Sequence, residues 1–339
     1  MQYSQCTAND GCTLAYQTSL LPPATTATNP RHRQKTCIIL MHGFSGSSAY
    51  FEKNFAALSA THHWVVAPDM RGHGRSGRSR GGYHVARLAA DLRDLVAHLR
   101  RDYVGGGDGD GRDTIRFVPV GCSIGAAVLW TYVELFGDDD FAGFVFVDQA
   151  PLQDRSVFGG DGDENGNGNG DGGAWDASKA HRGCYDEATT QAAQETWTRN
   201  PAAAHAGLVA DCLGYRFAPE PERGDDLSEE RRASDERFFA QISAQCDPVW
   251  LARLLADHTR YDHREAIEEG VTVPTLVLAG RRTGCFPLEG MRETVKRVER
   301  GQGKGLARFV VFDSGHWLFW EEPERFNGVV GEFVDSCTK

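Results

Sequence analysis

The sequence predicts an α/β fold in which a mostly parallel, doubly wound sheet is covered by helices on both faces and interrupted by an inserted helical cap. Short apolar runs typical of buried strands alternate with helical periodicity through residues 37–147 and again through residues 275–334. Between residues 152 and 271 the alternation stops, and large aromatic residues occur without clear parallel strands. We therefore expect a core of residues 1–151 and 272–339 and a helical cap of residues 152–271.

The core elements follow in order from an amino-terminal hairpin. Residues 1–20 alternate about the N-D-G sequence at 9–11, a strong turn signal, and a Pro/Thr-rich linker follows at residues 21–33. Strands are expected where apolar residues run continuously, at residues 37–41, 64–67, 115–120, 144–147, 275–278 and 309–312. Helices are expected where apolar residues recur at helical spacing, at residues 49–60, 83–101, 123–136, 288–298 and 322–334.

The composition and charge exclude several classes of protein. The chain has 339 residues and a net charge of −11, so no global attraction draws it to nucleic acid or to an anionic membrane. The first residues lack the apolar run of a signal peptide, and the longest apolar runs, such as residues 141–147, are too short to span a bilayer. Nine cysteines without a C-x-x-C pair are typical of reduced thiols in an intracellular protein. We expect a cytoplasmic protein that binds neither nucleic acid, nor membrane, nor metal.

Two glycine-rich runs interrupt the pattern, at residues 105–111 and 159–173. In the second run, Asp161 and Asp163 match the first half of an EF-hand calcium loop. Gly172 occupies the twelfth position, where such a loop requires a bidentate glutamate. We therefore expect a disordered, solvated loop at residues 159–173 rather than a calcium site.

A G-x-S-x-G pattern, G-C-S-I-G at residues 121–125, joins a predicted strand to a predicted helix. A sharp turn at such a junction lifts the serine hydroxyl clear of the sheet, and the flanking glycines let the backbone approach closely. The alternative is a serine that only caps the helix. Because the strand and the helix are both in place, we predict Ser123 as a nucleophile. Cys122 precedes the apex of the turn and is expected to pack in the core.

His316 lies in S-G-H-W at residues 314–317, directly after the last predicted strand. A histidine there can reach a nucleophile at the same edge of the sheet. A serine hydroxyl is a weak nucleophile unless a positioned imidazole takes its proton. We therefore predict His316 as the general base for Ser123.

Two backbone N–H groups are candidates for an oxyanion hole. The H-G-F turn at residues 42–44 can direct the N–H of Phe44 at the carbonyl oxygen under attack. The N–H of Ile124, the residue after the predicted nucleophile, is the second donor. Each donor in such a site contributes about 3 kcal/mol to the stability of the transition state.

These motifs together resemble those of the α/β-hydrolase fold enzymes. They are H-G-F at 42–44, D-M-R-G-H-G-R-S-G at 69–77, G-C-S-I-G at 121–125, and S-G-H-W with E-E-P-E-R-F at 314–326. The resemblance covers residues 1–150 and 272–339 and implies hydrolysis through an acyl-enzyme, without a metal or an organic cofactor. It also implies structural roles for Asp69 and Arg71 in a loop beside the site.

The sequence departs from this family at the triad acid. Most relatives carry it after the seventh strand, where this chain has Thr283, which cannot compensate an imidazolium charge. Asp148 ends the sixth strand, next to the nucleophile strand. Some branches of the family, among them haloalkane dehalogenases and certain lactone hydrolases, resemble this chain in placing the acid there. We predict Asp148 as the acid, ahead of Asp313, which is too near His316 in sequence, and of Glu289.

The predicted function is a serine hydrolase that cleaves an ester or lactone of a small to medium apolar substrate through Ser123, His316 and Asp148. Dehalogenases use an aspartate nucleophile, so Ser123 argues against that chemistry and, for the same reason, against epoxide hydrolysis. Carbon–carbon bond hydrolysis, thioester hydrolysis and cofactor-free haloperoxidase-like chemistry stay open within the same fold. A ligand-binding, receptor-like homologue with little turnover is the alternative from another class, and the absence of an acid at Thr283 favours it.

Overall fold

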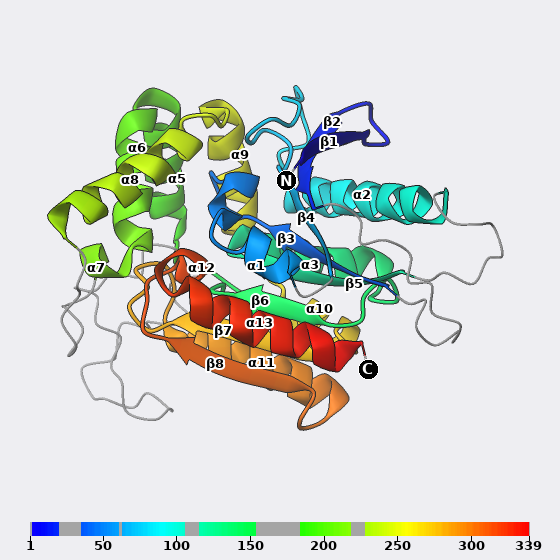
Figure 1. Ribbon diagram of the computed structural model, residues 1–339. Helices are drawn as coiled ribbons and strands as arrows, with labels where there is room; N and C mark the ends of the chain where they lie inside the picture. Colours follow the sequence, from blue (N-terminus) through cyan, green and yellow to red (C-terminus); the bar gives the residue numbers. More distant parts are fainter. Residues whose placement is uncertain are drawn as a thin grey trace, which may run out of the picture.

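The computed structural model describes residues 2–19, 35–60, 63–105, 115–153, 184–217 and 228–338. The predicted linker, the glycine-rich run at 159–173 and nearly all of the run at 105–111 lie outside these residues. One eight-stranded sheet forms the centre of the molecule, in the order β1-β2-β4-β3-β5-β6-β7-β8 (Figure 1). The strands are β1 (Gln2–Thr7), β2 (Thr13–Thr18), β3 (Lys35–Met41), β4 (Trp64–Pro68), β5 (Ile115–Cys122), β6 (Phe144–Val147), β7 (Thr275–Gly280) and β8 (Ala307–Phe312).

The pairing confirms the predicted doubly wound, mostly parallel sheet. β1 and β2 form the expected antiparallel hairpin, and β2 pairs antiparallel with β4. From β4 through β3, β5, β6 and β7 to β8, every neighbouring pair is parallel. All residues of β4, β6 and β7 are buried, which is why these strands read as continuous apolar runs. The edge strand β8 is only half-buried.

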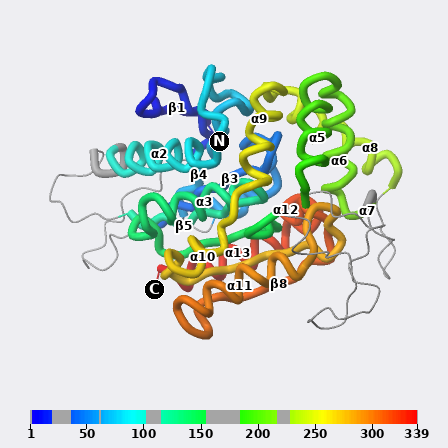
Figure 2. The backbone as a smooth tube through the Cα atoms, turned by 180° about the vertical axis from the view of Figure 1, so that it is seen from behind, coloured from blue at the N-terminus to red at the C-terminus, as the bar shows by residue number. Residues whose placement is uncertain are grey.

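Helices cover both faces of the sheet. On one face α1 (Phe55–Ser59) packs against α13 (Pro323–Cys337) (Figure 1). The other face, shown from behind in Figure 2, carries α2 (Val85–Gly105), α3 (Ile124–Phe136), α10 (Arg264–Gly270) and α11 (Leu288–Gln302), each packed against the next. No helix in the described ranges combines the length and the apolar character needed to cross a membrane.

One predicted helix is divided in the structure. The segment 49–60 contains a 3₁₀ turn, η2 (Ser48–Phe51), and the short α1, separated by residues 52–54. The buried Asn54 side chain donates to the carbonyl of Phe319 at 2.9 Å, which ties this break to the carboxyl-terminal part of the chain. The helix predicted at 322–334 is the undivided α13. A short helix that was not predicted, α12 (Leu318–Glu321), ends before Pro323, where α13 begins, because proline has no N–H to continue it.

The residues between β6 and β7 form helices that lie together beyond the carboxyl ends of the strands (Figure 1). They are α5 (Glu187–Arg199), α6 (Pro201–Cys212), α7 (Gly214–Phe217), α8 (Glu229–Ser243) and α9 (Pro248–His258). α5 packs against α6 and α9, and α6 packs against α8. α10 also falls within residues 152–271, but it packs against α3 and α11 in the layer that covers the sheet.

Candidate functional site

Ser123 lies at a strained turn between β5 and α3. Its φ of 54° and ψ of −126° are rarely adopted by a residue with a side chain. The side chain makes no capping hydrogen bond to α3, so Ser123 is not the simple helix cap considered above. Strained residues of this kind cluster at functional sites, where the surrounding structure holds them in place.

The glycines around Ser123 allow the backbone to crowd the turn. A Cβ added at Gly121 would lie 2.6 Å from the carbonyl oxygen of Gly125. A Cβ at Gly125 would lie 2.8 Å from the carbonyl oxygen of Met41. Both distances are far below ordinary van der Waals contact, so the turn requires glycine at both positions.

Asp148 follows β6 and also has a positive φ, of 46°. Its carboxylate is almost completely buried and accepts three hydrogen bonds. Oδ1 accepts from Nδ1 of His316 at 2.6 Å and from the Thr283 hydroxyl at 2.9 Å, and Oδ2 accepts from the N–H of Gly280 at 2.7 Å. The structure therefore brings the predicted acid into direct contact with the predicted base.

The other two acid candidates are engaged elsewhere. Asp313 forms an ion pair with Arg281 at 2.7 Å, on the protein surface. Glu289 lies in the first turn of α11 and faces Arg292 at 3.8 Å. Thr283, in contrast, is part of the site, because its hydroxyl donates to Asp148 and accepts from the N–H of Cys285 at 3.1 Å. The sequence analysis noted only that Thr283 has no carboxylate, and it did not predict the hydrogen bond to Asp148.

His316 is buried, with 6% of its surface exposed, between Asp148 and Cys285. Burial disfavours the charged imidazolium, but the neighbouring Cys285 thiol and Asp148 carboxylate outweigh burial and raise the pKa of His316. The hydrogen bond from Cys212 and the proximity of His316 lower the pKa of Cys285. His316 therefore has two neighbours that favour its charged form, Asp148 and Cys285. The sequence analysis predicted only Asp148.

Ser123 and His316 line the same small cavity, of about 70 Å³. The Ser123 hydroxyl donates a long hydrogen bond, of 3.5 Å, to Oε1 of Gln149, and it makes no other hydrogen bond within the described ranges. The hydrogen bond between Ser123 and His316 is thus not formed. Catalytic hydrogen bonds are often loose without substrate and tighten in the reacting complex.

The inserted helices form the far wall of this cavity. α6 contributes Leu208, Asp211 and Cys212, and α9 contributes Leu255 and His258. Nε2 of His258 lies 2.6 Å from the side-chain amide of Gln153. Burial lowers the pKa of His258 to about 3, so the imidazole is neutral near pH 7 and accepts from that amide.

The turn after β3 presents the N–H of Phe44 beside Ser123. A Cβ added at Gly43 would lie 3.2 Å from the Cβ of Ser123, which shows how closely this turn approaches the serine. The Phe44 N–H donates no hydrogen bond within the part of the chain that the structure describes. Ile124 is the first residue of α3, so its N–H has no acceptor in the helix.

Two buried histidines hold the Phe44 turn in position. Nδ1 of His42 donates to the carbonyl of Gly43 at 2.8 Å, and its Nε2 accepts from the N–H of Met70 at 2.9 Å. Nε2 of His73 accepts from the N–H of Ser45 at 3.3 Å. Burial lowers the pKa of His42 to about 4 and that of His73 to about 3, so both can accept as neutral rings. The carbonyl of Gly43 belongs to the same peptide group as the N–H of Phe44, so fixing one orients the other.

Asp69 and Arg71 organise the neighbouring loop. The Asp69 carboxylate accepts from the N–H of Ser48 at 2.7 Å. Arg71, only 1% exposed, donates to Asp91 at 2.6 Å and to Asp10 at 2.7 Å. Neither residue lines the cavity beside Ser123.

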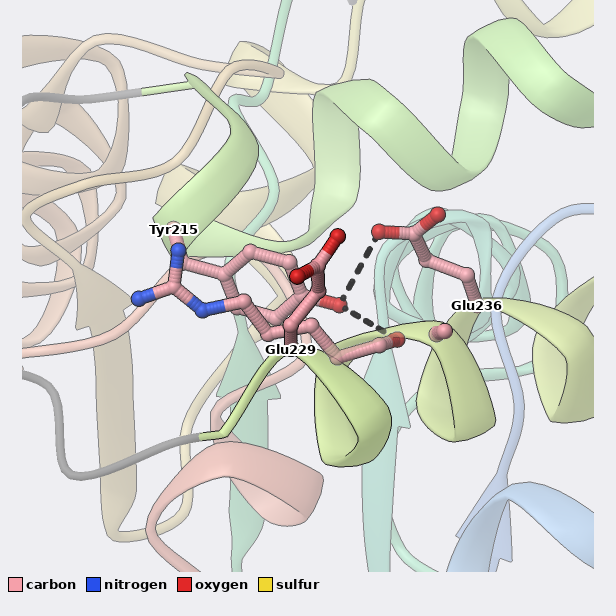
Figure 3. A pocket seen from close by; sticks show the side chains of 5 residues that line it. Tyr215, Glu229 and Glu236 are labelled. Carbon is pink, nitrogen blue, oxygen red and sulfur yellow. Dashed lines mark hydrogen bonds between the residues drawn. The ribbon is translucent and has the colours of Figure 1, made fainter.

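A second cavity, of about 540 Å³, lies near α7 and α8 (Figure 3). Its described lining residues include Tyr215, whose hydroxyl donates to the Arg232 carbonyl at 3.1 Å and to the Glu236 carboxylate at 3.4 Å. None of the predicted catalytic residues is among the described residues that line it. The smaller cavity beside Ser123 is therefore the candidate active site.

Comparison with known proteins identifies the family of the chain. The model of a family described as "Alpha/beta hydrolase family" matches residues 38–329. The chain belongs to the alpha/beta hydrolase family. Its eight-stranded sheet and flanking helices are those of the α/β-hydrolase fold, as the sequence motifs predicted.

Individual relatives point to hydrolytic enzymes. The chain is 21% identical over 319 residues to the AB hydrolase superfamily protein YisY of Bacillus subtilis, covering 88% of this chain and 91% of that one. It is 35% identical over 133 residues to epoxide hydrolase B of Mycobacterium tuberculosis, covering 39% of this chain and 34% of that one. Among solved structures, an esterase from Exiguobacterium antarcticum superimposes with a TM-score of 0.71 at 16% identity, covering 98% and 99% of the two chains. Membership of this family supports hydrolase activity.

Proposed function

We propose that this hydrolase is a serine esterase or lactonase that acts through Ser123, His316 and Asp148. The observation that carries the proposal is the Asp148–His316 hydrogen bond of 2.6 Å beside a serine held in a strained turn, with Ser123 and His316 facing one cavity. A serine, a histidine and a carboxylate in this order of contact form the machinery of acyl transfer.

The three side chains have distinct roles in the proposed reaction. Ser123 Oγ attacks the substrate carbonyl, and Nε2 of His316 takes its proton. Asp148 holds the Nδ1–H of His316, which fixes the tautomer and stabilises the imidazolium that forms. His316 then protonates the leaving oxygen and activates a water molecule that hydrolyses the acyl-enzyme.

The backbone N–H groups of Phe44 and Ile124 are the proposed oxyanion hole. The Phe44 N–H donates no hydrogen bond within the described residues, and the Ile124 N–H has no acceptor in α3. Ile124 follows Ser123 in sequence, and the turn before Phe44 lies close to the Ser123 side chain. Because His42 and His73 hold the turn around Phe44, its N–H is oriented before substrate arrives. Such preorganised donors stabilise the negative charge that develops on the carbonyl oxygen.

The lining of the cavity supports a small, apolar substrate group next to the nucleophile. Leu208, Leu255 and Phe286 present apolar surface to the space beside Ser123. The volume of this cavity, about 70 Å³, is much smaller than that of the second cavity, about 540 Å³. We therefore propose short acyl esters and small lactones as substrates, with the inserted helices acting as the cap that limits their size.

Epoxide hydrolysis is the competing activity suggested by the Mycobacterium tuberculosis relative, which is named for it. That chemistry uses an aspartate nucleophile, as noted above, and here the turn carries Ser123. A serine with an oxyanion hole favours a carbonyl substrate. The ligand-binding alternative makes the opposite prediction, because it requires substrate-like molecules to bind without turnover.

The test is a panel of nitrophenyl esters of increasing acyl length, small lactones and a styrene epoxide, assayed with the wild-type protein. We expect short esters or lactones to be hydrolysed and the epoxide to survive. Ser123→Ala should reduce kcat at least a thousandfold, while Ser336→Ala on α13 should match wild type. Undiminished hydrolysis by Ser123→Ala, or tight binding of these compounds without turnover by wild type, would contradict the proposal.

A further inference from the structure

Two cysteines that the proposed reaction does not use lie on the wall of the active-site cavity. Cys212 is the last residue of α6, and Cys285 lies between β7 and α11. Their sulfur atoms are 3.7 Å apart, and both side chains are buried. They line the same cavity as Ser123 and His316.

These cysteines and His316 form a compact set of metal-ligating atoms. One such atom from each of the three residues lies within 4.8 Å of the other two, and no other such group occurs within the described ranges. A tetrahedral zinc ion with Zn–S bonds of about 2.3 Å would hold two sulfurs about 3.8 Å apart. The observed separation of 3.7 Å is close to that value, whereas a disulfide would require about 2.05 Å.

His316 is already oriented as a metal-ligating histidine would be. Its Nδ1 donates to Asp148, so Nε2 is the nitrogen that would exchange its proton for a metal ion. Metal-binding histidines typically donate their other ring N–H to a carboxylate, and this contact fixes the ring and raises its basicity. Asp148 is itself fixed by the N–H of Gly280 and the hydroxyl of Thr283.

Backbone hydrogen bonds hold the three segments together. The N–H of His316 donates to the carbonyl of Cys212 at 2.8 Å. The N–H of Gly284 donates to the carbonyl of Asp211 at 3.0 Å, next to both cysteines in sequence. The ligand positions are therefore set by the fold, and a metal ion would not have to assemble them.

We propose that Cys212, Cys285 and His316 bind a thiophilic divalent metal ion, Zn²⁺, with the fourth coordination position left to a water molecule or substrate atom in the cavity. Two thiolates and one imidazole are a ligand set that zinc accepts with one position open. Zinc on Nε2 removes the lone pair that takes the proton of Ser123. Bound zinc therefore inhibits the hydrolase reversibly, a consequence that rests on the proposed function.

The binding test uses the reduced, full-length protein and needs no catalytic activity. After dialysis against Zn²⁺ alone, we expect about one zinc per chain in the wild type, and a loss of at least tenfold in affinity in Cys212→Ser and in Cys285→Ser. Cys337→Ser, a half-buried cysteine on α13, is the matched control and should bind like wild type. Equal zinc affinity in the wild type and the Cys212→Ser/Cys285→Ser double variant would overturn the proposal.

Binding of Co²⁺ to the wild-type protein tests the proposed metal site without any variant. The result therefore holds even if a serine variant fails to fold. Co²⁺ bound to wild-type protein should show the intense visible bands of a tetrahedral site and a thiolate-to-cobalt charge-transfer band in the near ultraviolet. Weak octahedral spectra without the thiolate band would overturn the site.

An activity assay then tests the inhibition by zinc separately from the binding of zinc. A small excess of Zn²⁺ should lower the rate of ester hydrolysis at least tenfold in wild type and in Cys337→Ser, and a chelator should restore it. Zinc that binds by the dialysis and cobalt tests to a protein that hydrolyses no substrate in the panel would leave the metal site standing and would contradict the proposed function instead. Hydrolysis that is undisturbed by bound zinc would overturn the inhibitory role.

Discussion

The carboxyl ends of β6 and β7 lie side by side. The carboxylate of Asp148 follows one strand, and its hydrogen-bond donors come from the end of the other. Asp148 directly follows β6, in a strained backbone conformation, and its carboxylate contacts His316. β7 ends at Gly280, whose N–H donates to that carboxylate, and the loop after β7 supplies the hydroxyl of Thr283. The strand after which the family resemblance places the acid, together with its loop, here supplies hydrogen-bond donors to Asp148.

In our proposal, this difference means that the position of the acid is set in space rather than along the chain. β6 and β7 are parallel neighbours, with Val147 opposite Leu278, so their carboxyl ends open onto the same point. A carboxylate from either loop can therefore lie beside Nδ1 of His316. Thr283 is then a positioning residue in our account, and its hydroxyl takes part in the site without carrying charge.

Replacing the acid should have the largest effect. Asp148→Asn keeps the size of the side chain but removes the charge that stabilises the imidazolium of His316. We expect kcat for a short ester to fall about 10⁴-fold, the loss seen when a serine-hydrolase triad acid is amidated. Steady-state kinetics of the folded variant provide the measurement. Activity within tenfold of wild type would mean that Asp148 is not the acid.

Moving the acid back to the neighbouring loop should recover part of that loss. The hydroxyl of Thr283 is 2.9 Å from Oδ1 of Asp148, so an aspartate at 283 brings its carboxylate into the same region. We expect the Asp148→Asn/Thr283→Asp variant to be roughly ten to a hundred times faster than Asp148→Asn alone, since a carboxylate again faces His316. A Thr283→Asn version in the same background is the matched control and should give no recovery.

Removing only the supporting hydroxyl should have a smaller effect. Thr283→Val preserves the shape but deletes a hydrogen bond to a charged group, a contact worth about 1.5–3 kcal/mol. We expect a decrease in kcat of roughly ten- to a hundredfold with little change in KM. Thr283→Ser, which restores a hydroxyl, should recover most of the rate. Identical rates for the valine and serine variants would remove Thr283 from the site.

The smallest expected effect concerns His263, which contacts the chain shortly after β6, and it is measured as a change in the free energy of unfolding. The N–H of His263 donates to the carbonyl of Pro151, shortly after Asp148, and its ring is buried against Trp130 and Tyr261. Burial lowers the pKa of His263 to about 3 from its ordinary value of 6.5. Between these values the unfolded chain binds a proton that the folded chain does not, so stability is lost as the pH falls.

His263→Phe keeps the ring stacking and removes this titration. We expect the free energy of unfolding to decrease less steeply with falling pH in the variant, by up to about 1.4 kcal/mol per pH unit below pH 6. Urea unfolding of both proteins at pH 7, 6 and 5 measures the difference. Parallel pH profiles would show that His263 does not contribute to the pH dependence.

The parts of the molecule that the sequence predicted are those determined by local pattern. Continuous apolar runs marked the buried strands, and the motif around Ser123 marked the turn between β5 and α3. The contact between Asp148 and His316 could be predicted because parallel strands place their carboxyl ends at one edge of the sheet. The prediction of one continuous helix over residues 49–60 was wrong. Tertiary contacts of Asn54 accompany the break, and such contacts leave no periodic signal in the sequence.

The parts that could not be predicted depend on contacts between distant residues. The Thr283–Asp148 hydrogen bond joins positions 135 residues apart, and the Cys212–Cys285 contact joins positions 73 residues apart. Neither pair forms a spacing motif such as C-x-x-C. The histidines that hold the Phe44 turn were also missed, although His42 and His73 both lie within the motifs that identify the family.

The measurement that tests the central claim most directly is labelling with a small fluorophosphonate, followed by intact-mass analysis and peptide mapping. Our account predicts one adduct per chain, on Ser123, formed orders of magnitude more slowly in Asp148→Asn, since activation of the serine depends on the Asp148–His316 pair. Folded wild-type protein that stays unlabelled, or that carries its adduct on a residue other than Ser123, would contradict the assignment of Ser123 as the nucleophile of this hydrolase.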